Sequence, residues 1–226
     1  MSPTRIHLTF DDSAGAATEG VLDLLRDFDV RATFFMIGRN VDEAAWCHGD
    51  VERARGVMCR AIVEGHEIGN HSYSHDPALF GAEFIRDFMR CDQVIASLYA
   101  QAGLTPRLPI RSRLPYGIQI FAGPRGGSAP PTLDPRVSLL ATIGRAHFHW
   151  TSLFDDWLQD ASPEQVLSAM LSHIERLTTV GVDPVLVLHD GTEKNEPADR
   201  SVVVHTLEAL LQHAKRKNWS FARPPA

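Results

Sequence analysis

Stretches in which every third or fourth residue is apolar alternate along the chain with short runs that are almost wholly apolar. The first pattern predicts amphipathic helices, and the second predicts buried strands. The predicted strands cover residues 6–11, 32–38, 66–70, 146–151 and 184–188, and the predicted helices cover residues 18–28, 50–64, 82–102, 136–144, 165–180 and 201–218. This regular alternation of strand and helix indicates an α/β protein with a parallel sheet.

Several element boundaries carry their own signals. Thr18 suits the N-cap of the first helix, and Ser162 before Pro163 suits the start of a later one. The chain holds roughly six to seven βα units and no glycine-rich phosphate loop, which favours a (β/α) barrel with about seven strands over a nucleotide-binding open sheet. We expect one domain over residues 1–226, because no internal repeat or linker divides the chain.

Residues 118–135 interrupt the alternation. They are rich in glycine and proline, and the run Gly123–Pro131 at their centre cannot hold regular structure. A compact domain rarely keeps so long an irregular loop without a use for it. We therefore expect this segment to shape a binding groove.

Composition excludes some classes of protein. The formal net charge of −6 argues against nucleic acid as the main partner, because phosphate binding requires clustered positive charge. No apolar run approaches the roughly 18–20 residues of a membrane span. The start of the chain lacks an export signal, and three cysteines without a CxxC spacing suit free thiols in a reducing compartment. We therefore expect a cytoplasmic protein.

Two neighbouring acids, Asp11 and Asp12, follow the first predicted strand. Within a strand their side chains would point to opposite faces, but at the strand's end the backbone turns and both can reach one cavity. One can then bind a metal ion while the other stays free as a base. The alternative is a turn or helix cap, in which adjacent acids are common.

His71 and His75 are four residues apart, so one turn of helix places both rings on the same side. That spacing is typical of a two-histidine metal site, and Pro77 indicates that the turn is brief and exposed. With Asp12 as a third ligand, positions stay open for water and substrate, as a catalytic metal requires. Zinc suits these ligands best, and cobalt or another first-row ion would also bind. The alternative is two unrelated surface histidines.

Other polar residues follow later strands. His189 ends an apolar strand, so it either makes a structural hydrogen bond or faces the mouth of an active site; we favour the second. Asp156 would orient His189, and the neighbouring Trp157 would give a sugar ring an apolar wall. Arg113 near Asp11 would hold that carboxylate ionised and aimed, unless it is an exposed loop arginine. Pro115 would fix the backbone so that the N–H of Tyr116 points towards a developing oxyanion.

These segments resemble, in this order, the motifs of carbohydrate esterase family four, the NodB-type polysaccharide deacetylases. The resemblance runs from about Ile6 to Phe221 and is carried by the segments 9–12, 71–75, 113–116 and 186–189, by the flanks 32–38 and 64–71, and by the pair Asp156–Trp157. Within the family, the layout is most similar to that of the chitooligosaccharide deacetylases. The family fold is a distorted (β/α) barrel, in agreement with the strand count.

The resemblance also implies roles. It implies Asp11 as general base, His189 as general acid with Asp156 behind it, Arg113 as the group that positions Asp11, and Tyr116 as an oxyanion donor through its backbone N–H. It implies Asp12, His71 and His75 as ligands of a divalent metal ion, and substrate contacts at Trp157, Leu188 and Tyr116.

The chain departs from the family pattern in three places. Ser13-Ala14 follows the acid pair in place of Gly-Pro, and Leu153 replaces an aspartate three residues before Asp156, with Asp155 a weaker partner for His189. The third departure is the expansion of residues 118–135, which we expect to reshape the substrate groove.

Motifs and resemblance together predict a metal-dependent hydrolase. Its substrate would be an N-acetylated amino-sugar oligomer or polysaccharide of the chitooligosaccharide or peptidoglycan type. Two alternatives stay open. The same chemistry would serve another acyl substrate, such as an O-acetyl xylan, a formamido sugar or a cyclic amide. The chain would otherwise be a carbohydrate-binding protein without activity. The oligomeric state is not predicted.

Overall fold

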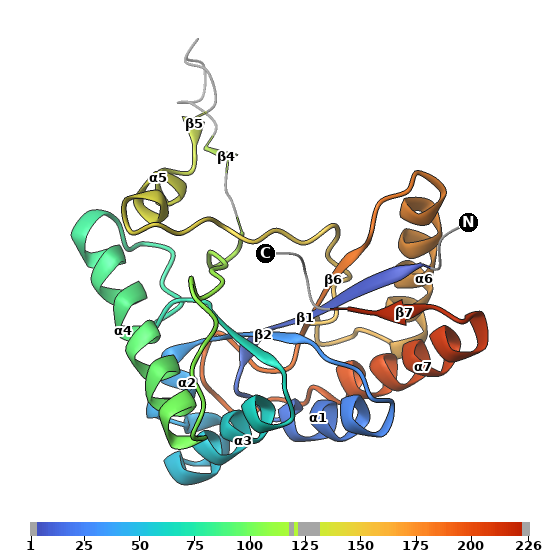
Figure 1. Ribbon diagram of the computed structural model, residues 1–226, viewed down its shortest axis with the longest axis horizontal. Helices are drawn as coiled ribbons and strands as arrows, with labels where there is room; N and C mark the ends of the chain where they lie inside the picture. Colours follow the sequence, from blue (N-terminus) through green and yellow to red (C-terminus); the bar gives the residue numbers. More distant parts are fainter. Residues whose placement is uncertain (1–3, 118–119, 122–131, 223–226) are drawn as a thin grey trace.

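A computed structural model describes residues 4–117, 120–121 and 132–222. Its centre is a sheet with the strand order β3-β2-β1-β6, in which β7 also pairs with β1 (Figure 1). These strands are β1 (Arg5–Ser13), β2 (Thr33–Met36), β3 (Glu67–Asn70), β6 (Val185–His189) and β7 (Ser220–Phe221). All their pairings are parallel. The predicted α/β class and parallel sheet are confirmed.

The helices surround this sheet. They are α1 (Thr18–Asp27), α2 (Gly38–Asp42), α3 (Val51–Val63), α4 (Gly81–Gln101), α5 (Pro135–Thr142), α6 (Pro163–Thr179) and α7 (Ser201–Lys217), with a 3-10 turn at Ala45–Cys47. The six predicted helices are all present, and the ends of each lie within two residues of the prediction. The short α2 and the 3-10 turn were not predicted, because so few residues show no periodicity.

Two irregular segments link the open edges of the sheet, β3 and β6. Ser112 forms parallel bridges with Asn70 of β3 and with His147, and Ser152 forms one with Leu186 of β6. The predicted strand at 146–151 is therefore not a regular strand. His147 pairs with Ser112, whereas Ser152 pairs with Leu186 of β6, so this segment changes its pairing partner and does not form the consecutive pairs of a regular strand. The arrangement agrees with the distorted barrel predicted from the sequence.

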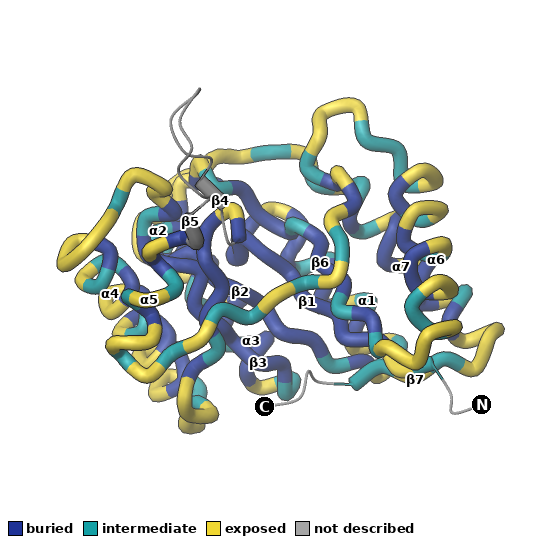
Figure 2. The backbone as a smooth tube through the Cα atoms, turned by 90° about the horizontal axis from the view of Figure 1, so that it is seen from above, coloured by how far each residue is buried: buried dark blue, intermediate teal, exposed yellow. Residues whose placement is uncertain are grey.

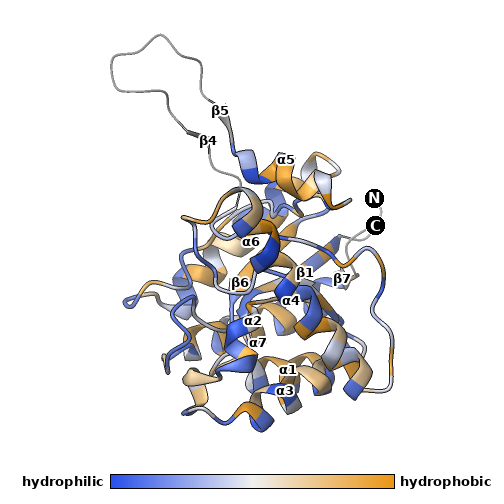
Figure 3. Ribbon diagram, turned by 90° about the vertical axis from the view of Figure 1, so that its left-hand side faces the viewer, coloured by the Kyte–Doolittle hydropathy of each residue, from blue (hydrophilic) through white to orange (hydrophobic). Residues whose placement is uncertain are grey.

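Strands β4 (Ile120–Phe121) and β5 (Thr132–Leu133) form a separate antiparallel pair that stands away from the sheet (Figure 3). The remainder of the predicted loop, residues 118–119 and 122–131, lies outside the described residues. The expectation that this segment shapes a groove, like that of one domain over residues 1–226, stays a prediction.

Strands β2 and β3 are buried at every residue, β1 at every residue but its first, and β6 at its three central residues (Figure 2). Alternation gives each strand two different faces. In β1, Leu8 and Phe10 belong to the main apolar core, whereas the hydroxyl of Thr9 accepts a hydrogen bond from Arg113 across the barrel interior. In β6, Leu186 and Leu188 also pack in that core. The amphipathic helices α1 and α3 supply the facing apolar side chains, and both carry apolar and polar patches in Figure 3.

Because the strands are parallel, their carboxyl ends meet at one edge. Asp11 lies opposite His189 in the β1–β6 register, and His71 follows directly on the last residue of β3. The parallel arrangement thus collects the polar residues that end separate strands.

Candidate metal centre and active site

An irregularity at the end of β1 turns two adjacent acids towards one site. The β1–β2 register shifts between Asp11 and Ser13, and the φ angle of Asp12 is 66°. This break ends the strict alternation of the strand, so Asp11 and Asp12 both approach the ring of His71. One oxygen of Asp11 lies 3.7 Å from Nε2 of His71, and Oδ1 of Asp12 lies 3.6 Å from it. The sequence expectation that both acids reach one cavity agrees with this geometry.

The residues after Asp12 tie β1 to β6. The hydroxyl of Ser13 donates to the buried carboxylate of Asp190 at 2.6 Å. A Cβ on Gly191 would lie 2.0 Å from the carbonyl oxygen of Asp12, so only glycine allows this close approach. Where the family pattern has Gly-Pro, this chain uses the Ser13 hydroxyl to fix the loop that carries the acids.

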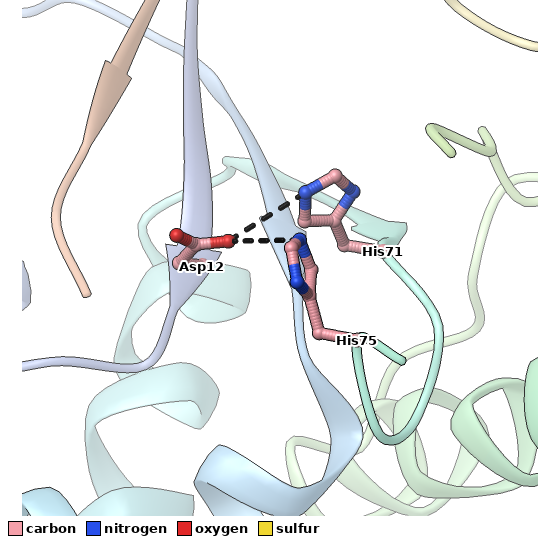
Figure 4. Close-up of side chains that lie close together, drawn as sticks. All are labelled: Asp12, His71 and His75. Carbon is pink, nitrogen blue, oxygen red and sulfur yellow. Dashed lines mark ion pairs between the residues drawn. The ribbon is translucent and has the colours of Figure 1, made fainter. Parts of the chain in front are cut away.

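Asp12, His71 and His75 form a compact group that fits a metal ion (Figure 4). One ligand atom from each residue lies within 4.8 Å of the other two. Oδ1 of Asp12 is 3.6 Å from Nε2 of each histidine, and it is buried without a hydrogen-bond partner among the described residues. Nδ1 of His71 lies 2.9 Å from the carbonyl oxygen of Arg113, which requires a proton on Nδ1 and leaves the Nε2 lone pair free. Three acceptors that converge without a donor between them suit a cation.

The ionisation of these groups supports the same interpretation. Burial lowers the pKa of His71 to about 3, and it also lowers the pKa of His75 far below its ordinary value. Both rings are therefore neutral near pH 7, as metal ligands must be. Burial raises the pKa of Asp12 to about 7, an effect that the charge of His189 opposes and that of Asp11 reinforces. A nearby cation would favour the charged carboxylate.

The segment that carries the two histidines is a bend, and the predicted exposed helical turn is wrong. Ser72 and His75 have φ angles of 71° and 55°, which no α-helix contains. The bend is held by the hydroxyl of Ser72, which accepts from the N–H of His75, and by the carboxylate of Asp87, which accepts from the N–H of Tyr73. His71 and His75 are both buried, with ring centroids 4.9 Å apart. The expected pairing of the rings therefore arises from a different backbone path.

Arg113 is fully buried beside Asp11 and is not an exposed loop arginine. Its Nη1 donates to Oδ1 of Asp11 at 2.5 Å and to the hydroxyl of Thr9 at 2.9 Å. Its Nε donates to the carbonyl oxygen of Phe148 at 3.1 Å. The bond to Asp11 joins residues that are 102 positions apart in the sequence and fixes the direction of the Asp11 carboxylate.

His189 pairs with Asp156 on the other side of the site. Nδ1 of His189 lies 3.0 Å from Oδ1 of Asp156, and the backbone N–H of His189 donates to Oδ2 at 2.6 Å. Burial by itself lowers the pKa of His189, but Asp156 and, to a smaller extent, Asp12 and Asp11 outweigh it and raise this pKa to about 9. His189 is thus an imidazolium near pH 7. The weaker alternative partner, Asp155, is exposed, whereas Asp156 is fully buried.

Tyr116 lies in a tight turn after Arg113. The N–H of Gly117 donates to the carbonyl oxygen of Leu114 at 2.8 Å, and Tyr116 has a φ angle of 59°. Proline at the second position and a positive φ at the third are the pattern of a type II turn. The side chain of Tyr116 is half exposed, and its hydroxyl donates to Oε2 of Glu193 at 2.5 Å.

A cavity of about 1010 Å³ opens over these groups. Its lining includes eight residues named here: Asp11, Asp12, His71, His75, Tyr116, Trp157, His189 and Glu193. Apolar side chains, among them Trp150 and Leu153, form part of its wall. Most of the other lining residues are polar or charged, among them Gln159, Lys194 and Arg200, so the cavity suits a polar ligand that also has an apolar face. Trp157 lies where the sequence predicted an apolar wall.

The structure contradicts the expected substrate contact of Leu188. Its side chain is fully buried in the core between the sheet and the helices. The residue precedes His189, so alternation in β6 turns it to the opposite face from the histidine. Proximity in the sequence does not bring its side chain into the cavity.

Glu193 is a cavity residue that the sequence analysis did not identify. Its Oε2 lies 3.7 Å from Nδ1 of His75 and accepts the hydroxyl of Tyr116, and its backbone carbonyl accepts a bond from Arg39. Glu193 lies two residues after Gly191, in a segment without periodicity. Closeness to the last motif was therefore the one feature of the sequence that could have indicated a role for it.

Comparisons with known proteins agree with this arrangement. Residues 1–120 match the family model described as polysaccharide deacetylase. The putative polysaccharide deacetylase YheN of Bacillus subtilis is 27% identical over 223 residues, which cover 98% of this chain and 67% of that protein. A chitooligosaccharide deacetylase of Sinorhizobium fredii is 30% identical over 210 residues, with 91% and 81% coverage.

The solved structures give the same fold. The catalytic domain of a peptidoglycan N-acetylglucosamine deacetylase from Eubacterium rectale matches with a TM-score of 0.72 at 21% identity, covering 100% of this chain and 90% of that chain. The site and fold define a hydrolase of the carbohydrate deacetylase class. The chain belongs to the polysaccharide deacetylase family. The resemblance drawn from the motifs is therefore confirmed.

Proposed function

We propose that the protein hydrolyses the N-acetyl group of an amino sugar carried in an oligosaccharide or polysaccharide of the chitooligosaccharide or peptidoglycan type. One observation carries this proposal. A carboxylate outside the ligand group (Asp11), an Asp-His-His ligand group and an imidazolium (His189) all line one cavity whose wall includes two tryptophans. The chitooligosaccharide deacetylase among the relatives supports the same substrate class.

The ligand group of Asp12, His71 and His75 would hold a divalent ion, and its two nitrogens and one oxygen favour zinc, with cobalt as the alternative. Such an ion, when bound, supplies Lewis acidity to the acyl carbonyl and acidity to a nearby water molecule.

In this proposal, Asp11 takes a proton from the attacking water, and the water oxygen forms a bond to the acetyl carbon. Arg113 positions Asp11 for this step through the bond between Nη1 and Oδ1. The backbone N–H of Tyr116 donates to the carbonyl oxygen as negative charge develops on it. Removal of one such hydrogen-bond donor typically costs about 2.7–4 kcal/mol of transition-state stabilisation.

His189 completes the reaction as general acid. It delivers the proton of its Nε2 to the amine nitrogen as the C–N bond breaks, so acetate and a free amino sugar leave. Asp156 holds Nδ1 of the same ring and stabilises its charged form. Without that proton the tetrahedral intermediate would expel water instead of the amine.

The cavity walls support a sugar substrate. Trp157 is in edge contact with His189 at a centroid distance of 5.0 Å, and Trp150 lies on the wall near Tyr116. Indole rings are suitable surfaces for the apolar face of a sugar ring. Among the described residues, no helix combines the length and the apolar character that a bilayer crossing requires. The cytoplasmic location stays a prediction.

The test is to incubate zinc-loaded and cobalt-loaded protein with N-acetylglucosamine oligomers and with peptidoglycan fragments, and to measure acetate and free amine by mass spectrometry. We expect both products in equal amounts, and their loss in the variant His189→Ala. Acetate from O-acetyl xylan alone, formate from a formamido sugar or ammonia from a cyclic amide would replace the proposed substrate. Saturable sugar binding without any product would refute catalysis.

A further inference from the structure

Arg136 is a buried arginine to which the proposed reaction assigns no role. It lies in the first turn of α5 and is only 2% exposed. Its Nε donates to both oxygens of Asp134 at 3.0 Å, and its Nη2 donates to Oδ2 at 2.6 Å. Asp134 is itself buried and also caps α5 by accepting from the N–H of Arg136. The carboxylate thus balances the charge of Arg136 and fixes the plane of its guanidinium.

The same guanidinium contacts the turn that contains Tyr116. Its Nη1 donates to the carbonyl oxygen of Pro115 at 3.1 Å, and its Nη2 donates to that of Gly117 at 3.1 Å. These two carbonyls belong to the residues immediately before and after Tyr116. A planar group with donors in fixed directions can satisfy two carbonyls and a carboxylate together, which a lysine cannot do.

The Pro115 carbonyl matters because of the geometry of the peptide bond. This carbonyl and the N–H of Tyr116 belong to one planar trans peptide unit, so they point in opposite directions. A donor that holds the oxygen on the α5 side therefore also sets the direction of the N–H. It polarises the peptide as well, which makes the N–H a stronger donor.

This peptide needs such a support. The turn has the type II pattern, in which the residue at the third position has a positive φ, and Tyr116 has a φ of 59°. A side chain with a Cβ disfavours that region, and a type I turn would relieve the strain. The change from type II to type I reverses the central peptide, which would turn the Tyr116 N–H away and bring the Pro115 carbonyl to its place.

We propose that Arg136, fixed by Asp134, is a positioning residue that holds the Tyr116 peptide with its N–H directed at the reacting carbonyl of the substrate. This inference rests on the proposed function for its effect on catalysis. The orientation of the peptide itself rests on the hydrogen bonds of the Pro115 and Gly117 carbonyls.

The test compares Arg136→Gln with Arg145→Gln in metal-loaded protein. Arg145 is a matched control, because it is also largely buried, pairs with a carboxylate (Asp92) and donates to a backbone carbonyl (Ile110) away from the turn. With an N-acetylated chitooligosaccharide, we expect Arg136→Gln to lower kcat about ten- to hundredfold with KM within about twofold. Loss of a whole oxyanion donor costs roughly 10²–10³ in kcat, and a misdirected donor costs less. Arg145→Gln should keep kcat within about threefold.

Two further measurements separate positioning from general destabilisation. Affinity for a phosphonate that mimics the tetrahedral intermediate should fall in parallel with kcat/KM in Arg136→Gln, while the affinity for the free amino-sugar product stays unchanged. If Arg136→Gln does not fold, Asp134→Asn replaces it, because asparagine still caps α5 but gives the guanidinium one neutral acceptor oxygen in place of a charged pair. We expect the same pattern from it at smaller amplitude.

An unchanged kcat in the folded variants, or an equal loss in Arg145→Gln, would overturn the inference. Failure of the proposed function is recognised separately, because the wild type would then release no acetate from any N-acetylated sugar. In that event the amide resonance of Tyr116 in NMR spectra still tests whether Arg136 sets the orientation of the Tyr116 peptide. A large ¹⁵N shift change in Arg136→Gln is expected from reversal of the peptide, and an unchanged resonance refutes it.

Discussion

Replacement of Asp156 by asparagine tests the pairing that makes His189 an acid. The pKa of His189 is about 9 against an ordinary 6.5, although burial, the largest influence, lowers it. At 1.36 kcal/mol per pH unit, this difference corresponds to about 3 kcal/mol in favour of the imidazolium. Asp156 contributes more to the rise than Asp12 or Asp11. In Asp156→Asn, burial still lowers the pKa of His189, but the carboxylate that raises this pKa most is gone. We therefore expect the pKa of His189 to fall below 6.5.

The consequence for catalysis follows from the protonated fraction. Proton donation requires the imidazolium, so kcat declines as the pH rises through the pKa of His189. At pH 8 about nine tenths of the wild-type residue is charged, against roughly 3% or less in the variant, so kcat should fall at least about thirtyfold. The wild-type rate should hold until near pH 9, whereas the variant should lose activity progressively above about pH 6.

The assay measures acetate release between pH 5.5 and 9.5 with metal content verified at each pH. Asp155→Asn is the matched control, because Asp155 is exposed and asparagine tolerates its φ of 55°. This control should retain kcat within about twofold. A pH profile for Asp156→Asn that coincides with the wild type, or a comparable loss in Asp155→Asn, would show that Asp156 does not control the protonation of His189.

Three further predictions concern the metal group, the base and the core. Asp12→Ala and His71→Ala should each lose tight metal binding by elemental analysis, and stoichiometric metal in both would eliminate the ligand assignment. Asp11→Asn should keep the metal but lower kcat by roughly 10²-fold or more, as expected for a general base; near-normal turnover would transfer that role elsewhere. Leu188→Ala should lower the free energy of unfolding by about 2–5 kcal/mol through a core cavity while KM stays unchanged, and a raised KM with intact stability would restore Leu188 to the substrate site.

Local chemistry explains why the helices were predictable. The ends of α3 and α6 follow from apolar periodicity and from caps, which involve neighbours only a few residues away. The prediction that Thr18 caps α1 is wrong, because Thr18 is the first residue of that helix and its hydroxyl donates to the carboxylate of Asp190. The paired rings of His71 and His75 were also expected, but their backbone was assigned to a helical turn. A spacing of four residues identifies the partners, whereas the path between them depends on hydrogen bonds that the backbone donates to Asp87 of α4 and to the hydroxyl of Ser72.

Residues without a motif escaped prediction. Glu193 meets Tyr116 across 77 residues, and Arg136 meets Pro115 across 21. Neither contact leaves a periodic trace, because periodicity records only which face of an element is buried. Leu188 illustrates the reverse error, in which a neighbour of a functional residue was assigned to the site although alternation places it on the other face.

The amino-acid sequence by itself determined the order of strands and helices and the identity of the acids, histidines and arginine, since these depend on local periodicity and residue type. The tertiary structure decided which of them meet. Arg113 reaches Asp11 across 102 residues and Asp156 reaches His189 across 33. Asp11 and His189 lie together because their parallel strands end at one edge of the sheet, and the irregular segments that link the sheet's outer strands bring Arg113 and Asp156 to them. The break in β1 at Asp12 likewise depends on that packing, and it converts two adjacent acids into one candidate base and one candidate metal ligand.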